Sequence, residues 1–256
     1  MPITYLDIED AKKQSGLRMV VVAGLPSPWS EAAKGILHIK NIPWTAVYLD
    51  SSNNDMAKWT GSRSAPVIMY NNEPSRPGWK QILLLAERLS PEPSLLPLDP
   101  VKKTQAIELC HQICGEMGLG WVRRLNSVHI GLTGEGGFPK PIAQYLAQKY
   151  GYQKQQGLEY EAHVISLLKM LADHLHKQRD KDEPFYMGTT LSAVDIYSAT
   201  FMAYFRPLDA EHSPMPDSIR SAFESMSEQV AAALDPILIE HRDFIYSTYL
   251  ELPLSL

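Results

Sequence analysis

Cysteine is scarce in this sequence, since only Cys110 and Cys114 occur among 256 residues. The two lie four positions apart in a stretch that reads as helix, where a disulfide would close no long loop. A fold held together by disulfides is therefore excluded, and we expect a reducing, cytoplasmic compartment. Because this pair has no second pair of ligands, the sequence also predicts no metal site.

Long apolar runs and an excess of basic charge are missing as well. The first sixteen residues are polar and acidic, unlike a signal peptide. No stretch approaches the roughly 18 apolar residues that cross a bilayer. The chain has 24 Lys and Arg against 29 Asp and Glu, which gives a net charge of −5. We therefore expect neither a nucleic acid nor a membrane as partner.

The first ninety residues alternate between strand and helix signals. Short apolar runs predict three strands and a weaker fourth strand at an edge, over 17–24, 44–49, 65–70 and 74–78. Helical patterns predict a helix that Asn41 ends, a short one within 50–64 and one over 79–89. Residues 1–16 are predicted as an N-terminal arm or a short extra element. This pattern predicts an α/β domain over residues 1–90.

The remaining residues carry almost no strand signal. Pro91, Pro93 and Pro97 predict a stiff linker over 91–100. Five helices are predicted beyond it, over 101–130, 140–178, 191–206, 217–232 and 235–248. The glycine-rich stretch 131–139 matches no phosphate-binding pattern and is predicted as a surface loop. Residues 101–256 are therefore predicted to form an all-helical domain.

Three short motifs narrow the fold further. Ser192 and Asp195 form an S-x-x-D box at a predicted helix start, where the carboxylate caps the helix. Ala65-Pro66 enters the third predicted strand. The turn after the first strand reads Ser27-Pro28-Trp29-Ser30. Ser followed by Pro is also an ordinary helix start, so a purely capping role for Ser27 stays open beside a functional one.

Together these motifs resemble the glutathione transferase superfamily, in an atypical serine-type-like form, over about residues 17–248. The resemblance implies a thioredoxin-like domain that binds glutathione, followed by an all-helical domain. It also implies a homodimer that conjugates glutathione to a small hydrophobic electrophile, as in detoxification. By this resemblance Ser27 activates the glutathione sulfur, with Ser30 as the substitute, and Ala65 before a cis Pro66 offers its backbone to the cysteinyl part.

The sequence departs from this family at the helix that follows the fourth strand. Family members begin it with Glu/Gln-Ser, which binds the γ-glutamyl end, whereas Gly78-Trp79 stands here and offers backbone amides. The departure leaves open an alternative, a non-catalytic ligand-binding or interaction protein of the same fold. A thiol–disulfide oxidoreductase is disfavoured, because no cysteine precedes Cys110.

A second substrate is expected between the two domains, where clefts favour small ligands. Met117, Trp121 and Arg124 follow one another at steps of four and three, which places them on one face of a continuous helix. With Trp29 and Tyr204 they are the predicted second-substrate residues. The same stripe is also typical of plain hydrophobic core.

Overall fold

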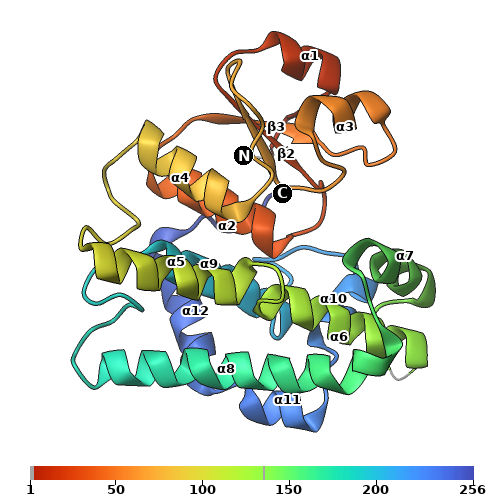
Figure 1. Ribbon diagram of the computed structural model, residues 1–256, viewed down its shortest axis with the longest axis vertical. Helices are drawn as coiled ribbons and strands as arrows, with labels where there is room; N and C mark the ends of the chain where they lie inside the picture. Colours follow the sequence, from red (N-terminus) through yellow and green to blue (C-terminus); the bar gives the residue numbers. More distant parts are fainter. Residues whose placement is uncertain (1–2, 135) are drawn as a thin grey trace.

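The computed structural model describes residues 3–134 and 136–256, and it contains the two parts that the sequence predicts (Figure 1). Within these residues a four-stranded sheet and helices α1 to α4 form the α/β part, and helices α5 to α12 form the rest. The segment 90–99 joins the two without a helix or strand. No helix in the described ranges combines the length and apolarity that a membrane crossing requires.

The sheet has the strand order β1-β3-β2-β4. Its strands are β1 (Tyr5–Leu6), β2 (Leu17–Val21), β3 (Trp44–Tyr48) and β4 (Val67–Tyr70). Val20 of β2 lies opposite Val47 of the parallel strand β3 and opposite Val67 of the antiparallel strand β4. The parallel pair requires a crossover connection, which helix α2 (Pro28–Ile39) supplies. All five residues of β2 are buried because it lies in the middle of the sheet.

Alternate side chains of the strands face two different helical layers, because successive strand residues point to opposite sides. One face packs against α1 (Ile8–Lys13) and α3 (Asn54–Thr60) through Val20, Val47 and Val67. The other face packs against α2 and α4 (Trp79–Leu89) through Met19 and Ile68. Helices α2 and α4 lie between the sheet and the all-helical part, so they bring the α/β domain to the interface (Figure 1).

Of the two alternatives predicted for residues 1–16, residues 3–16 fit the short extra element and not the arm, because Tyr5 of β1 pairs with Ala46 and Ala11 of α1 is fully buried. One prediction for the α/β domain needs correction. The predicted edge strand 74–78 is only a single bridge between Ile68 and Arg76. The prolines at 74 and 77 flank that bridge and lack an N–H group, so the ladder does not continue.

The all-helical domain is built around the central helix α9. Its helices are α5 (Pro100–Cys114), α6 (Leu119–Thr133), α7 (Lys140–Tyr150), α8 (Gly157–Arg179), α9 (Ala193–Phe201), α10 (Asp217–Glu224), α11 (Glu228–Ala233) and α12 (Pro236–Tyr249), with short 3-10 turns at Lys154–Gln156 and Met202–Tyr204. Every residue of α9 is buried, and α9 packs against α2, α5 and α12. The capping box predicted at its start is present, with the Ser192 N–H donating to the Asp195 carboxylate at 2.8 Å.

Three helices were predicted as continuous, but the structure divides each of them into two. Their predicted ranges are 101–130, 140–178 and 217–232. In the first, Met117 takes a φ of 57°, and a Cβ on Gly118 would lie 2.5 Å from the His111 carbonyl oxygen. In the second, Gly151 ends α7 in the left-handed region with a φ of 68°. In the third, the Ser227 hydroxyl accepts a backbone N–H and starts α11. Local backbone chemistry therefore interrupts apolar patterns that look continuous.

Candidate functional site

A cavity of about 580 Å³ opens where the two parts of the chain meet. Its size falls within the roughly 300–1,000 Å³ that is usual for small-molecule sites. The α/β part contributes the turn after β2, the residues before β4 and the start of α4. The all-helical part contributes residues of α6, α7, α9 and α10. The cavity is therefore a candidate binding site with one wall from each part of the chain.

Ser27 lies at the start of α2 and lines this cavity. Its backbone is extended, with Pro28 at the first helical position, as the Ser-Pro pair predicts. The hydroxyl nevertheless caps no backbone N–H of α2, and it makes no hydrogen bond to any of the residues that the structure describes. The side chain of Ser27 is half-buried. Its hydroxyl is thus free to donate to a ligand at the positive end of a twelve-residue helix.

The other two predicted residues of this turn behave differently from each other. Trp29 lines the cavity, and its Nε1 donates a 2.8 Å hydrogen bond to the Cys114 carbonyl oxygen. Its ring meets Phe201 edge to face at 4.7 Å between centroids, which fixes its place at the domain boundary. Ser30 is fully buried and is not part of the cavity lining. The structure therefore brings Ser27, and not Ser30, to the cavity.

Ala65 and Pro66 form the cavity wall just before β4. The peptide bond between them is cis, as the resemblance implies. Ser64, which sequence reasoning missed, lines the cavity beside them and adds a hydroxyl. A serine directly before the Ala-Pro pair was the signal available for it in the sequence.

Gly78 and Trp79 line the cavity at the start of α4. The Gln81 side chain accepts the Gly78 N–H at 3.3 Å. Trp79 is held against the all-helical part, because Tyr197 donates its hydroxyl to the Trp79 carbonyl oxygen at 3.3 Å and packs on its ring. The Trp79 side chain therefore forms a wall of the cavity beside the amide groups that begin the helix.

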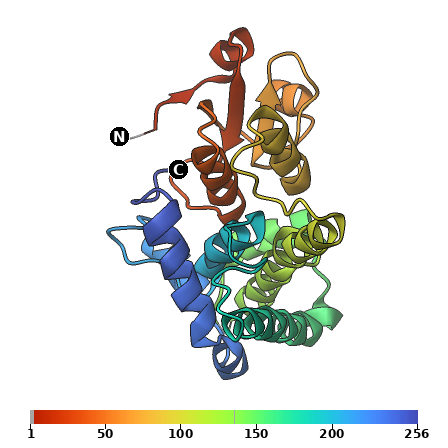
Figure 2. The ribbon, with the colours of Figure 1, turned by 90° about the vertical axis from the view of Figure 1, so that its left-hand side faces the viewer.

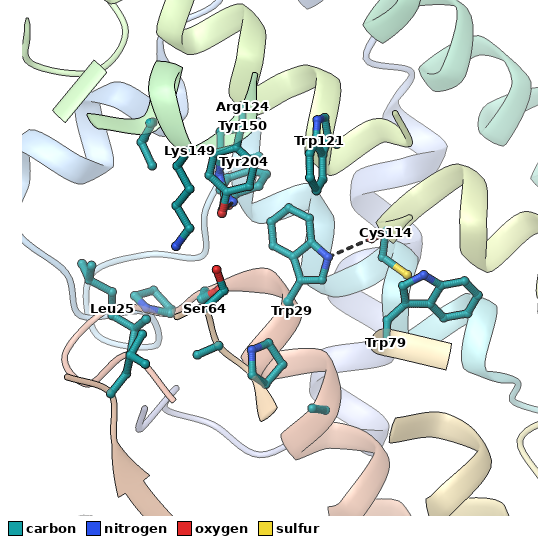
Figure 3. A pocket seen from close by; sticks show the side chains of 18 of the residues that line it. Leu25, Trp29, Ser64, Trp79, Cys114, Trp121, Arg124, Lys149, Tyr150 and Tyr204 are labelled. Atoms are coloured by element: carbon teal, nitrogen blue, oxygen red, sulfur yellow. Dashed lines mark hydrogen bonds between the residues drawn. The ribbon is translucent and has the colours of Figure 1, made fainter. Parts of the chain in front are cut away.

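Arg124 dominates the wall that the all-helical part supplies (Figure 3). Its two terminal nitrogens donate to the hydroxyls of Tyr150 and Tyr204. Its guanidinium also lies over the Trp29 ring, 4.5 Å from the centroid. Burial raises the pKa of Tyr204, so its phenol remains neutral at physiological pH. Lys149 of α7 lines the same wall, and Figure 3 shows its side chain reaching into the cavity toward Ser64.

Cys114 also reaches the cavity wall, but it has none of the properties of a reactive thiol. Both cysteines are free and buried, and the Cys114 thiol donates to the Cys110 carbonyl oxygen at 3.0 Å. Burial raises the pKa of both thiols, whereas reactive cysteines have a lowered pKa. Within residues 3–134 and 136–256 no cluster of three or more His, Cys, Asp or Glu side chains is arranged to hold a metal ion.

The predicted second-substrate residues mostly meet at the cavity. Trp29, Trp121, Arg124 and Tyr204 line it. Met117 does not, because it lies exposed in the turn between α5 and α6. Sequence reasoning missed the residues of α7 and α10 that complete this wall, which are Ile142, Tyr145, Leu146, Lys149, Tyr150, Ile219 and Phe223. The spacing of Ile142, Leu146 and Tyr150 at steps of four was the available signal.

Comparison with known proteins finds similar structures but no similar sequences. Neither a sequence-family model nor a curated protein matches this chain. A glutathione S-transferase from Methylobacterium radiotolerans superposes with a TM-score of 0.59 at 18% identity, over 91% of this chain and 92% of that one. A glutathione S-transferase from Xanthobacter autotrophicus superposes with a TM-score of 0.57 at 14% identity, over 94% of this chain and 98% of that one. A glutathione transferase family member from Pseudomonas fluorescens superposes with a TM-score of 0.55 at 15% identity, over 89% of this chain and 92% of that one.

These likenesses cover both parts of the chain and nearly the whole of each structure compared. The sheet, the cis Ala65-Pro66 bond and the capping box at α9 lie where the resemblance placed them. The chain therefore has the fold of the glutathione transferases.

Proposed function

We propose that this chain is a glutathione transferase that joins the sulfur of glutathione to a small hydrophobic electrophile. The observation that carries the proposal is the Ser27 hydroxyl, which faces the cavity at the start of α2 without a hydrogen-bond partner among the described residues. Solved structures of this fold support it, because the Methylobacterium protein was crystallised with glutathione sulfonate and the Pseudomonas protein with two glutathione molecules.

In the proposed complex, glutathione lies along the wall of the α/β part. The backbone of Ala65 pairs with the cysteinyl part, and the N-terminal end of α4 at Gly78 and Trp79, where the Trp79 amide lies, meets the γ-glutamyl carboxylate. The missing Glu/Gln-Ser side chains are thus replaced by backbone groups. The second substrate contacts Trp29, Trp121 and Tyr204.

The chemistry requires the sulfur to be an anion when it attacks. A free thiol has a pKa of about 8.5, so it is mostly protonated at neutral pH. The Ser27 hydroxyl donates a hydrogen bond to the thiolate, and the N-terminal end of α2 adds a positive potential. Each pKa unit requires only about 1.4 kcal/mol. The thiolate then forms a bond to the electrophilic carbon, and the leaving group departs with its electron pair.

Ser27→Ala is the decisive variant. Loss of one charge-assisted hydrogen bond is expected to lower kcat/KM with 1-chloro-2,4-dinitrobenzene about 10- to 100-fold. The variant should also move the acid limb of the pH–rate profile toward higher pH, because the thiol is less acidic without the hydroxyl. Ser30→Ala is the matched control, since that hydroxyl is buried, has no hydrogen-bond partner in the part of the chain that the structure describes, and lies outside the cavity lining.

The same experiment distinguishes the alternative function. Retention of the wild-type protein on immobilised glutathione, with turnover that Ser27→Ala reduces, supports the transferase. Absence of retention and turnover, with calorimetry showing tight binding of apolar ligands, supports a non-catalytic binding protein of this fold. Gly78 and Trp79 in place of Glu/Gln-Ser are the observation that favours this second candidate.

We also propose that the protein works as a homodimer in the cytoplasm, where it removes reactive electrophiles. Leu84 of α4, Leu98 of the linker and Val101 of α5 are exposed apolar side chains. Figure 2 shows α4 and α5 on the side of the molecule that faces the viewer. If two copies of the chain associate through this surface, these side chains become buried against one another. The two free, buried cysteines fit a reducing compartment.

Light scattering is expected to give twice the chain mass of 28.8 kDa. The double variant Leu84→Glu/Val101→Glu should give a monomer, because it places charges in the proposed interface. Leu158→Glu changes another exposed apolar residue, at the start of α8 and outside this surface, and should leave the mass unchanged. A wild-type monomer would exclude the dimer.

A further inference from the structure

Two neighbouring arginines of α6 have opposite environments. Arg123 is fully buried and donates to three backbone carbonyl oxygens, those of Tyr204, Phe223 and Ser225, and to the Asn126 side chain. Its surroundings explain it as a structural residue that ties α6 to the segments around α10. Arg124 points to the cavity instead, and among the described residues its hydrogen-bond partners are only the hydroxyls of Tyr150 and Tyr204.

The charge of Arg124 has no counterpart in the described part of the chain. A guanidinium has five N–H donors, and two of these meet the tyrosine hydroxyls, so three remain without a described partner. None of the ion pairs in these residues includes Arg124 or Lys149. The lining contains one acidic residue, Glu116, and it pairs with neither cation. This wall therefore carries net positive charge inside an aromatic environment.

Aromatic rings hold the guanidinium in place without neutralising it. Arg124 lies 4.5 Å from the Trp29 ring centroid, 4.6 Å from that of Tyr150 and 5.5 Å from that of Tyr204. Cation–π contacts stabilise a cation and keep its orientation fixed, but they supply no acceptor for its remaining N–H groups. A planar guanidinium fixed in this way is suited to a carboxylate, which accepts two N–H groups side by side.

We propose that the second substrate is a small aromatic electrophile that carries a carboxylate, and that Arg124 binds this carboxylate with help from Lys149. The proposal rests on the transferase function and names its substrate class. The rings of Trp29 and Trp121 contact the apolar body of the substrate. Arg124 belongs to α6 in the all-helical wall, whereas Ala65 and Gly78 belong to the wall of the α/β part, so we assign Arg124 to the second substrate and not to glutathione.

Matched electrophiles test the proposal directly. 4-Chloro-3-nitrobenzoate and 4-chloro-3-nitrobenzamide share a leaving group and differ in the charge of one substituent. With each rate divided by its uncatalysed rate, the wild-type enzyme is expected to prefer the benzoate. Arg124→Met should lower kcat/KM for the benzoate about 10- to 100-fold and change that for the benzamide much less. Arg124→Lys should keep part of the preference, because it keeps the charge and loses the planar fork.

Lys149→Met provides a second variant if Arg124→Met does not fold, because Lys149 is exposed and belongs to none of these hydrogen bonds. It should lower the benzoate preference, whereas Lys169→Gln on α8, outside the cavity, should not. Added salt should also weaken the wild-type preference for the benzoate. Equal rates of the wild type for the two probes, or equal losses in Arg124→Met, would overturn the proposal. A rise in KM for glutathione alone would assign Arg124 to glutathione and overturn it too.

A binding measurement separates this proposal from the function on which it rests. 3-Nitrobenzoate and 3-nitrobenzamide lack a leaving group, and Trp29 and Trp121 in the lining report their binding by fluorescence. Tighter binding of the benzoate that Arg124→Met abolishes supports the carboxylate site even when no conjugation occurs. Turnover of 1-chloro-2,4-dinitrobenzene together with equal binding of both probes would support the transferase function and overturn the proposed carboxylate site.

Discussion

Replacement of Asp195 by alanine is expected to lower the free energy of unfolding by about 3–5 kcal/mol. The carboxylate is fully buried and accepts four hydrogen bonds. Two come from the N–H and hydroxyl of Ser192, at 2.8 and 2.6 Å, and one from the Tyr186 N–H at 2.9 Å. The fourth partner is the imidazole of His241, which is also fully buried, with its Nε2 at 3.0 Å. Alanine leaves all four donors buried without an acceptor.

The size of this effect follows from the position of α9. That helix packs against α2 of the α/β part and against α5 and α12 of the all-helical part, so a defect at its start reaches both. Tyr186 and His241 belong to two other segments that meet at the carboxylate. Asp195 therefore links three segments of chain, in addition to its capping role.

Urea denaturation of Asp195→Ala beside two milder variants measures the effect. Ser192→Ala removes one donor and leaves the carboxylate with three, so it should cost about 1 kcal/mol. Asp99→Ala removes an exposed cap whose side chain accepts only the Lys102 N–H, at 2.9 Å, and should also cost about 1 kcal/mol. If Asp195→Ala lowers the free energy of unfolding no more than Asp99→Ala does, Asp195 does not link the three segments in the way described.

The cavity wall of the α/β part, where we propose that glutathione binds, is predictable because its residues sit at element boundaries. Ser27 and Gly78 begin helices and Ala65 precedes a strand, and each boundary has a local signal of proline or glycine. The position of Ser30 is harder to predict, because it lies within the first turn of α2 and the direction of its side chain depends on which face α2 buries. That choice is made by packing against the rest of the chain, which a local motif does not contain.

The cavity wall of the all-helical part, where we propose that the second substrate binds, shows where spacing arguments fail. Trp121 and Arg124 lie three apart within α6, so their common face survives in the structure. Met117 was joined to them by assuming one continuous helix, and the chain breaks that helix at Gly115 and Gly118. The steps of four in α7 indicate that Ile142, Leu146 and Tyr150 share a face, but not that this face lines the cavity, because that depends on how α7 packs beside α6.

Removal of the Lys34 charge is expected to destabilise the protein in a pH-dependent way. Lys34 and Glu31 form an ion pair on α2 at 2.7 Å, and both side chains are almost entirely buried. The second carboxylate oxygen of Glu31 has no hydrogen-bond partner in the described residues. Lys34→Met leaves Glu31 as a buried anion without a cation, which should cost about 3–5 kcal/mol at neutral pH.

The direction of the pH dependence follows from Glu31. Burial raises the pKa of its carboxyl above the ordinary value of 4.5, while Lys34 opposes that rise. In the unfolded chain the carboxyl titrates near its ordinary value, so the folded state binds more protons between the two pKa values. The stabilising contribution of Glu31 is therefore complete below the unfolded pKa and is lost as pH rises through the folded pKa. Without Lys34 the folded pKa rises further, and the loss at neutral pH is larger.

Urea denaturation of wild type and Lys34→Met from pH 5 to pH 7.5 tests this sign. The difference in unfolding free energy should be largest at pH 7.5 and should shrink toward pH 5, and other titrating groups cancel because they are common to both proteins. Glu31→Gln/Lys34→Met removes both charges at similar volume and should recover most of the stability without the pH dependence, since replacement of a whole buried pair is often neutral. If the unfolding free energy of Lys34→Met is lower than that of the wild type by the same amount at every pH in this range, Lys34 acts through packing of its side chain and not through its charge.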